Sequence, residues 1–299
     1  MKQIPTIKRI FRKKTKPQYK RYTRSTAGNI ILFTLLALAG LFSALPLVYC
    51  INASFKPLDE LLKFPPTIFV RRPVLDNYLT LPTVLSSLGI PLSRYFFNSL
   101  FVALTGTVLH IFAASLAAFV FSKTHIKGRK VLFIIVQFAL LYNSYTLAVP
   151  QYLIFSKMKI IDTYLVYILP TIPSAMGCFL MKQYIDSSIP DSLLEAACID
   201  GAKPYAIFFK IVMPIVKPAW MTLFLFSFRD QWANISSGTI FREQLKTLPQ
   251  ILSTITAGGV ARTGNAMVAT VLLLIPPIIV FAISQANVME TMSSSGIKE

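Results

Sequence analysis

The sequence predicts an all-α membrane protein with six transmembrane helices and one polar helix-turn-helix between the fourth and fifth. Three observations lead to this fold class. The 299 residues are 54% hydrophobic and only 14% charged, with a mean hydropathy of +0.60, whereas soluble domains carry about 25% charged residues. Six apolar runs are long enough to cross the hydrocarbon core of a bilayer. One polar stretch, residues 187–218, separates the fourth run from the fifth.

The expected spans are joined by short or mixed polar connections. Each contains roughly the 20 apolar residues that a transmembrane helix needs. They are placed at residues 29–51, 95–121, 131–155, 163–182, 219–238 and 265–287, so that 29–287 form one six-span domain. The first run follows a basic segment, but it is too long for a signal peptide and lacks a clean small-residue cleavage site. We therefore interpret it as a retained span.

Residues 187–218 predict two short helices joined by a turn. Pro190 suits a first helical turn, where its missing N–H is not needed. Gly201 ends that helix because glycine adopts the left-handed conformation at little cost. Pro204 opens the second helix, and Pro214 and Pro218 are expected to end it before the next span. A polar helix-turn-helix between two spans indicates a protein partner.

The basic residues determine the expected orientation. With the amino terminus inside, 19 of the 30 Lys and Arg lie on the inner side, ten of them in the acid-free segment 1–28. The net charge is then +13 inside and +5 outside, which the positive-inside rule favours. Both termini, the polar segment 187–218 and the tail 288–299 are therefore expected in the cytoplasm. The mixed connections 52–93 and 239–264 are expected outside, as loops.

Several kinds of chemistry are disfavoured by the sequence. The net charge of +18 is concentrated in the amino-terminal segment, where it serves as a topology anchor and lipid attachment rather than a nucleic-acid site. The three cysteines lack C-x-x-C spacing and the two histidines are isolated, so neither a metal site nor catalytic residues are expected. There is also no G-x-x-x-x-G-K-[ST] loop for nucleotide phosphates, so the chain is not expected to be an ATPase.

A motif in the polar segment resembles the signature of bacterial ABC importer permeases. It reads Glu195-Ala196-Ala197, then Gly201, then Ile211-x-x-Pro214. The wider pattern is similar to the carbohydrate-importing branch, and most similar to subunits equivalent to the maltose permease G component. Further similarity lies in residues 156–170, in Gln231-Trp232-Ala233-Asn234 and in the ending SSSGIKE, and residues 55–78 resemble the outer loop of a complex-oligosaccharide subgroup.

The resemblance implies that 187–218 is a coupling helix that docks into a cytoplasmic ATPase. The residues it assigns to this contact are Glu195, Ala196, Ala197, Asp200, Gly201, Phe208 and Phe209. Small alanines allow close approach, a glutamate offers a charge-assisted hydrogen bond, and aromatic rings bury a large apolar area. The implied partners are an ATPase dimer that binds ATP and Mg, a second homologous permease subunit in a heterodimer, and an extracellular solute-binding lipoprotein. This chain itself is expected to hold no cofactor.

The substrate path is expected among polar and aromatic residues within the spans. Such groups are costly in lipid and usually face the interior of a bundle. The candidates are Asn143, Tyr145, Gln231, Trp232 and Asn234; their alternative role is ordinary hydrogen bonding between helices. Arg229 and Asp230 are expected to pair. The resemblance also implies that 239–264 touches the binding protein, with Gly258-Gly259 allowing it to insert as a flexible finger.

The predicted function is permease-mediated uptake of oligosaccharides in a bacterial plasma membrane. The alternative is an ABC importer permease for a non-sugar solute such as a peptide, which the signature motif alone would not exclude. An intramembrane enzyme would need paired carboxylates, a histidine cluster or an activated serine within the spans. A self-contained secondary transporter would show inverted repeats. Neither fits the sequence as well.

Overall fold

The computed structural model describes residues 26–86, 89–142, 144–235 and 238–296, and every element in this part of the chain is a helix. The chain divides into two units, Met1–Val48 and Tyr49–Glu299. The predicted basic segment lies outside the described residues up to residue 25, as do residues 297–299 of the predicted tail. The all-helical fold class is therefore confirmed for the described residues.

The first predicted span is confirmed as helix α1, Thr26–Ser54. Most of its side chains up to Val48, which belong to the first unit, are exposed, including Phe33 and Phe42 at 75% each. A helix that is apolar on every side needs lipid around it rather than water. Its length and composition are those of a membrane span.

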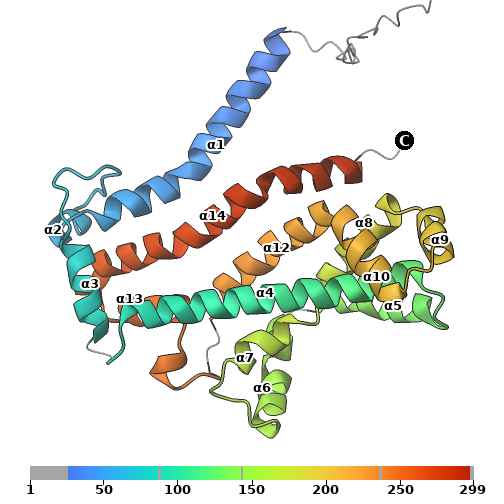
Figure 1. The fold of residues 1–299 in the computed structure, drawn as a ribbon. Coiled ribbons are helices and arrows are strands. Elements are labelled where there is room, and N and C mark those ends of the chain that lie inside the picture. The colour runs from blue at the N-terminus through green and yellow to red at the C-terminus, as the bar shows by residue number, and fades with distance from the viewer. Residues whose placement is uncertain (1–25, 87–88, 143, 236–237, 297–299) are drawn as a thin grey trace, which may run out of the picture. The chain divides into compact units, whose positions relative to one another are not determined.

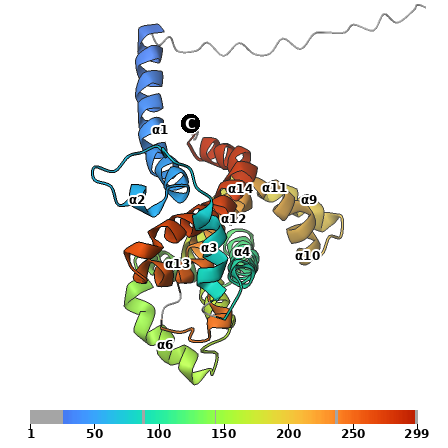
Figure 2. The same ribbon diagram turned by 90° about the vertical axis from the view of Figure 1, so that its left-hand side faces the viewer.

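The second unit is built on α4, Leu92–Lys123, which packs against α8, Ala175–Ser188, and α12, Lys217–Trp232. The long α14, Thr263–Gly296, packs on α12, and the views along and across α4 show these helices side by side (Figures 1 and 2). Helices α4 and α14 are long and apolar enough to cross a membrane. The predicted spans 95–121 and 265–287 are thereby confirmed as helices.

One predicted span is bent, and another begins just after a bend. The first comprises α7, Leu165–Ile168, and the 3-10 turn η2, Leu169–Thr171, which meet α8 at 40°. The fifth predicted span, α12, follows a bend: the helical run Pro204–Ile215 meets α12 at 78°, and α12 ends at Trp232 rather than at residue 238. The described chain thus contains three helices able to cross a membrane, or up to five if each bent pair is one crossing.

The prediction of one continuous helix over 131–155 is wrong. The chain forms α5, Arg129–Ala139, then the 3-10 turn η1, Ser144–Leu147, and α6, Ala148–Lys157. Pro150 explains where the second helix begins, because a proline is tolerated in a first turn but removes a backbone donor from a helix interior. Neither α5 nor α6 alone is long enough to span a bilayer.

The expectation that 52–93 and 239–264 are loops is also corrected. They contain α2, Leu58–Leu61, α3, Asp76–Ser86, and α13, Leu248–Ala257, together with the 3-10 turns η4, Glu243–Leu245, and η5, Val260–Arg262. Apolar side chains of α3 and α13 recur at helical spacing and are fully buried, which a composition rich in proline and charge concealed. The segment before Gly258-Gly259 is therefore a packed helix and not a flexible finger.

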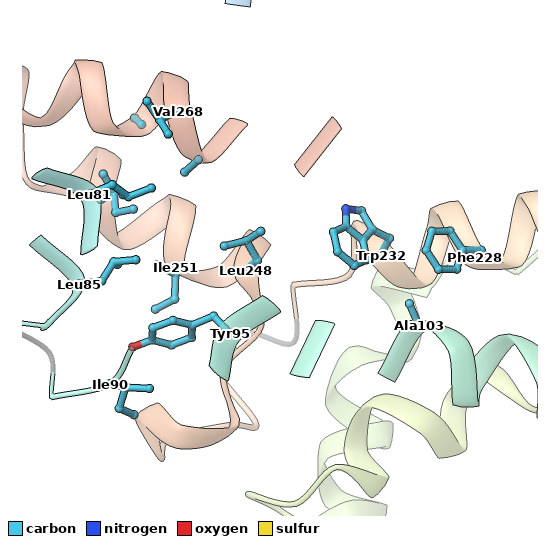
Figure 3. Close-up of a cluster of buried hydrophobic side chains, with 13 residues drawn as sticks. Leu81, Leu85, Ile90, Tyr95, Ala103, Phe228, Trp232, Leu248, Ile251 and Val268 are labelled. Atoms are coloured by element: carbon cyan, nitrogen blue, oxygen red, sulfur yellow. The ribbon is translucent and has the colours of Figure 1, made fainter. Parts of the chain in front are cut away.

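Helices α3 and α13 form a core with α4, α12 and α14 (Figure 3). Leu81 and Leu85 of α3 face Ile251 of α13, and Tyr95 of α4 lies beside them (Figure 3). In the same core the indole Nε1 of Trp232 donates to the carbonyl oxygen of Leu273 at 2.9 Å. That carbonyl lacks its helical donor because Pro277, four residues on, has no N–H. The indole therefore satisfies a polar group that the proline leaves open.

Candidate functional site

The polar segment folds as the predicted helix-turn-helix. It contains α9, Asp191–Ile199, α10, Pro204–Ile207, a π-helical turn η3, Phe208–Val212, and α11, Met213–Ile215. We call residues 191–215 the hairpin. Pro190 is the residue before α9 rather than part of its first turn, and Pro214 lies inside the helical run, which ends at the bend before α12.

The turn of the hairpin depends on Gly201. Its φ is +78°, in the left-handed region that glycine adopts without a penalty. Its N–H donates to the carbonyl of Cys198 and the N–H of Ala202 donates to that of Ala197, each at 3.0 Å. This pair of bonds is the Schellman motif, which satisfies the last carbonyls of α9 and reverses the chain.

One side of the hairpin is buried against its own chain. Ala197 is 8% exposed and Phe208 only 2%, in a cluster with residues of α4 and α8. The Phe208 ring lies 5.6 Å from that of Phe119 in α4. The structure thus differs from the expectation that these two residues contact a partner, because they are already enclosed and fix the hairpin to the helices behind it.

The other side of the hairpin is open. The remaining predicted contact residues are exposed: Glu195, Ala196, Asp200, Gly201 and Phe209. Ile199, which the sequence reasoning missed, is 87% exposed at the tip, and Tyr205 is 63% exposed. Ile199 is four residues after Glu195, so helical spacing alone places it on the same face. An apolar tip beside a carboxylate is suited to burial in a protein cleft.

An ion pair fixes the start of the hairpin. The Nζ of Lys123, at the end of α4, donates to the carbonyl of Ile189 at 2.6 Å and to the carboxylate of Asp191 at 2.7 Å. The hydrogen bond and charge of Lys123 hold the pKa of Asp191 below its usual value. The hairpin is thereby connected directly to α4.

A second connection crosses the bend between the hairpin and α12. The indole Nε1 of Trp220 donates to the carbonyl oxygen of Met213 at 3.1 Å. In an unbroken helix this carbonyl would accept from the N–H four residues on, but the 78° bend lies between them. The hairpin is therefore joined to α12 by a side-chain hydrogen bond as well as by the main chain.

The predicted substrate-path residues have different surroundings. Asn143 lies outside the described residues, as does the side chain of Tyr145. Trp232 is buried in the core, whereas Gln231 and Asn234 are half-buried. The buried Oε1 of Gln231 has no hydrogen-bond partner among the residues that the structure describes. The structure therefore brings together the three residues near the end of α12 and leaves their role a prediction.

Neighbouring polar residues hold helices together. The Nδ1 of His110 lies 2.9 Å from the carbonyl of Thr171. Asn98 donates to the carbonyls of Gln244 and Lys246 at 2.8 and 2.9 Å. Arg229 and Asp230 form the predicted ion pair, at 2.9 Å. No group of three or more His, Cys, Asp and Glu in the described part of the chain is placed to hold a metal ion.

A dense polar contact lies at the other end of α4. The Asp162 carboxylate accepts from the N–H of Phe241 at 3.0 Å, and from the N–H and Nε of Arg242 at 2.9 and 2.7 Å. Burial by itself raises the pKa of Asp162, but these hydrogen bonds and the guanidinium charge outweigh it and lower the pKa. Asp162 therefore fastens residues 239–242 to the turn before α7.

Known proteins resemble this chain over most of its length. It is 28% identical over 286 residues to the arabinooligosaccharides transport system permease protein AraQ of Bacillus subtilis, covering 94% of this chain and 98% of that protein. It is 30% identical to the galactooligosaccharides permease protein GanQ of the same species, over 93% and 97%, and 26% identical to the inner membrane ABC transporter permease YcjP of Escherichia coli, over 92% and 98%.

A solved structure shares the fold. It is a bacterial ABC transporter involved in the import of the acidic polysaccharide alginate, with a TM-score of 0.73 and 22% identity over 88% of this chain and 98% of the matched chain. Residues 72–293 match the family described as the binding-protein-dependent transport system inner membrane component. Such a component works with an ATPase and a binding protein and is not itself the ATPase. The chain therefore belongs to this family, as the multi-pass permease subunit of a binding-protein-dependent ABC importer.

Proposed function

We propose that this permease subunit takes up oligosaccharides and is driven by a separate cytoplasmic ATPase that docks on the hairpin. The observation that carries the proposal is the open face of the hairpin, with Glu195 and the 87% exposed Ile199 at its tip. Apolar side chains exposed outside lipid mark protein contact sites. The buried face, through Phe208, gives a docked ATPase a firm hold on α4 and α8.

The same proposal includes the finer topology. The chain crosses the bacterial plasma membrane six times: α1, α4, α12 and α14 each form one crossing, α5 and α6 together form the third, and α7 with α8 forms the fourth. Both termini, the segment 1–28, the hairpin and the tail 288–299 are then cytoplasmic, and 29–287 form the membrane domain. The charge imbalance between the two sides supports this orientation.

The proposed substrate class comes from the relatives, whose names specify arabino- and galactooligosaccharides. Of the predicted residues, Asn143, Tyr145, Gln231 and Asn234 are proposed to line the path, whereas Trp232 is buried in the core. Gln231 is the strongest of these candidates, since an unpartnered amide oxygen can accept a hydrogen bond from a sugar hydroxyl. A homologous second permease subunit, an ATPase dimer that supplies ATP and Mg, and an extracellular binding lipoprotein complete the proposed complex.

Glu195→Ala tests the coupling site in the reconstituted complex. Loss of a charge-assisted hydrogen bond in a docked interface is expected to lower ATP hydrolysis stimulated by the loaded binding protein by about tenfold, with normal membrane insertion. Asp59→Ala, which removes an exposed acid far from the hairpin, is the matched control and should retain stimulation. Normal stimulation in Glu195→Ala would refute the hairpin assignment.

The substrate class is tested separately, with the unaltered complex and a panel of oligosaccharides and peptides. Uptake and stimulated ATP hydrolysis with at least one oligosaccharide are expected. Stimulation by peptides alone would replace the oligosaccharide proposal with the alternative solute class and leave the coupling result untouched.

A further inference from the structure

A basic cavity lies where the second predicted span meets the aqueous phase. It has a volume of about 380 Å³ and is lined by the end of α4, the start of α5 and one side of α8. Its principal side chains are Phe121, Arg129, Lys130, Phe133, Lys182 and Asp186. Cavities of this size accommodate small ligands. None of these residues belongs to the hairpin or to the proposed substrate path.

The charge of the cavity favours an anion. Arg129, Lys130 and Lys182 are opposed by one carboxylate, that of Asp186. That carboxylate is already engaged, because it accepts from Ser122 and from the Nζ of Lys182, the latter at 2.6 Å. Its negative charge is therefore largely balanced within the site.

The cations are held in different ways. Arg129 donates through Nη1 to the carbonyls of Ser122 and Thr124, at 3.3 and 2.7 Å, which fixes its guanidinium at the end of α4. The Nζ of Lys182 lies 4.7 Å from the ring centre of Phe133. Lys130 is exposed and has no ion pair or hydrogen bond with the residues that the structure describes. Two of the cations are thus positioned by contacts within the chain, and the third is free to bind.

Two aromatic side chains of the cavity lead to an exposed apolar surface of α5. Phe121 and Phe133 line the cavity, their rings 5.8 Å apart. Beyond them α5 buries no residue in this chain and exposes Val131, Ile135 and Phe138 at 61%, 58% and 63%. The apolar run of α4 ends at Lys123, so cations and rings meet at the level where lipid headgroups lie.

From this arrangement we infer that the cavity binds the headgroup of an anionic phospholipid. The phosphate lies against Lys130 and Arg129, and the acyl chains follow Phe133 and the exposed side of α5. Basic pockets between membrane helices recognise such headgroups by charge. The inference requires that the chain is a membrane protein, and it does not depend on the hairpin or on the sugar.

The test is native mass spectrometry of the purified full complex with added phosphatidylglycerol. Replacing Arg129, Lys130 and Lys182 by Gln is expected to weaken binding about fivefold for each cation removed. Lys130→Gln alone should give one such step, and it keeps the test valid if the triple variant does not fold. Asp186→Asn should strengthen binding, because it removes the opposing charge.

The matched control replaces Lys63, Lys157 and Lys159 by Gln, which removes the same charge from exposed positions elsewhere, and should bind normally. Phosphatidylcholine should not substitute for phosphatidylglycerol, and millimolar inorganic phosphate should not displace it. Unchanged binding in both cation variants, equal binding of phosphatidylcholine, weaker binding in Asp186→Asn or full displacement by phosphate would each overturn the inference.

Discussion

Side chains near the two ends of α4 have opposite surroundings: they are buried and hydrogen-bonded at one end and exposed at the other. Near its first residues, the chain turns polar side chains inward and satisfies them: Asn98 bonds two carbonyls of 244–246, and the N–H of Leu248 donates to the Oγ of Ser99 at 2.8 Å. Near its last residues, the hairpin turns Glu195 and Ile199 outward and leaves them uncovered.

The buried contacts near the start of α4 hold helices together, whereas the exposed face of the hairpin is open to a partner protein. Buried polar groups with all their bonds made specify one arrangement of helices. An exposed apolar residue beside a carboxylate stabilises nothing in its own chain. Substitutions in the hairpin are therefore expected to change coupling to the ATPase, whereas substitutions at the α13 end of α4 are expected to change stability.

The largest effect is expected from Gly201→Val. A valine at φ +78° is strained by about 1–2 kcal/mol, so the Schellman turn shifts and displaces the tip with Ile199. Stimulated ATP hydrolysis in the reconstituted complex should fall roughly tenfold or more, while the strain lowers the melting temperature by only a few degrees.

Gly89→Val is the matched control, because Gly89 has the same φ of +78° and, like Gly201, open space around an added Cβ. It should retain coupling. Equal loss in both variants would mean that backbone strain in general, and not the hairpin, limits the complex.

Gly177→Ala is expected to act on stability. An added Cβ would lie 2.8 Å from the Nε2 of His110 and 3.2 Å from the Cβ of Ala114, so α8 would have to move away from α4. The expected cost is about 1–3 kcal/mol, measured as a lower melting temperature in detergent. Gly40→Ala, with nothing within 4 Å, should not lower it.

Trp232→Phe removes one hydrogen bond and keeps an aromatic ring in the core. The carbonyl of Leu273 then loses its donor, at a cost of about 0.5–1.5 kcal/mol. Thermal unfolding of the full complex measures this loss. An unchanged melting temperature would show that water takes over the carbonyl beside Pro277.

The smallest effect is expected in the stability of the protein at acidic pH. Because the pKa of Asp162 lies below its ordinary value of 3.8, its ionised form contributes stability above that value, and the contribution disappears as pH falls through the lowered pKa. Asp162→Asn should flatten the loss of melting temperature as the pH falls below about 4, and Arg242→Gln should do the same. Acid slopes identical to that of the unaltered protein would contradict this role.

Much of the fold could be predicted from the lengths of the apolar runs and from the glycines and prolines that separate helices. Runs such as 95–121 contain enough apolar residues to make a long helix unavoidable, and Gly201 marked the turn of the hairpin. Residues 131–155 misled, because average hydropathy is insensitive to one proline and a few polar residues that divide a helix. Helix α13 was missed since its apolar spacing is short and flanked by charge.

The site was predictable in identity and less so in orientation. The motif located Glu195 and Gly201, but it could not distinguish Ala197 and Phe208, which face inward, from Ile199, which faces out. That distinction depends on which side of α9 meets α4 and α8, a tertiary contact that no local pattern encodes. Helical spacing from Glu195 would have added Ile199 to the list.

The two tryptophans of the chain have a practical consequence. Each indole N–H bonds a carbonyl that lacks its helical donor, Trp220 at the bend after the hairpin and Trp232 beside Pro277. Indole emission is sensitive to such bonds, so the chain carries two built-in optical reporters, one at the bend after the hairpin and one in the core. In Trp232→Phe only Trp220, near the hairpin, would emit from this chain, and in Trp220→Phe only Trp232, in the core, would do so. Stopped-flow fluorescence can thus measure, without any added label, the order in which the surroundings of Trp220 and Trp232 change during a transport cycle.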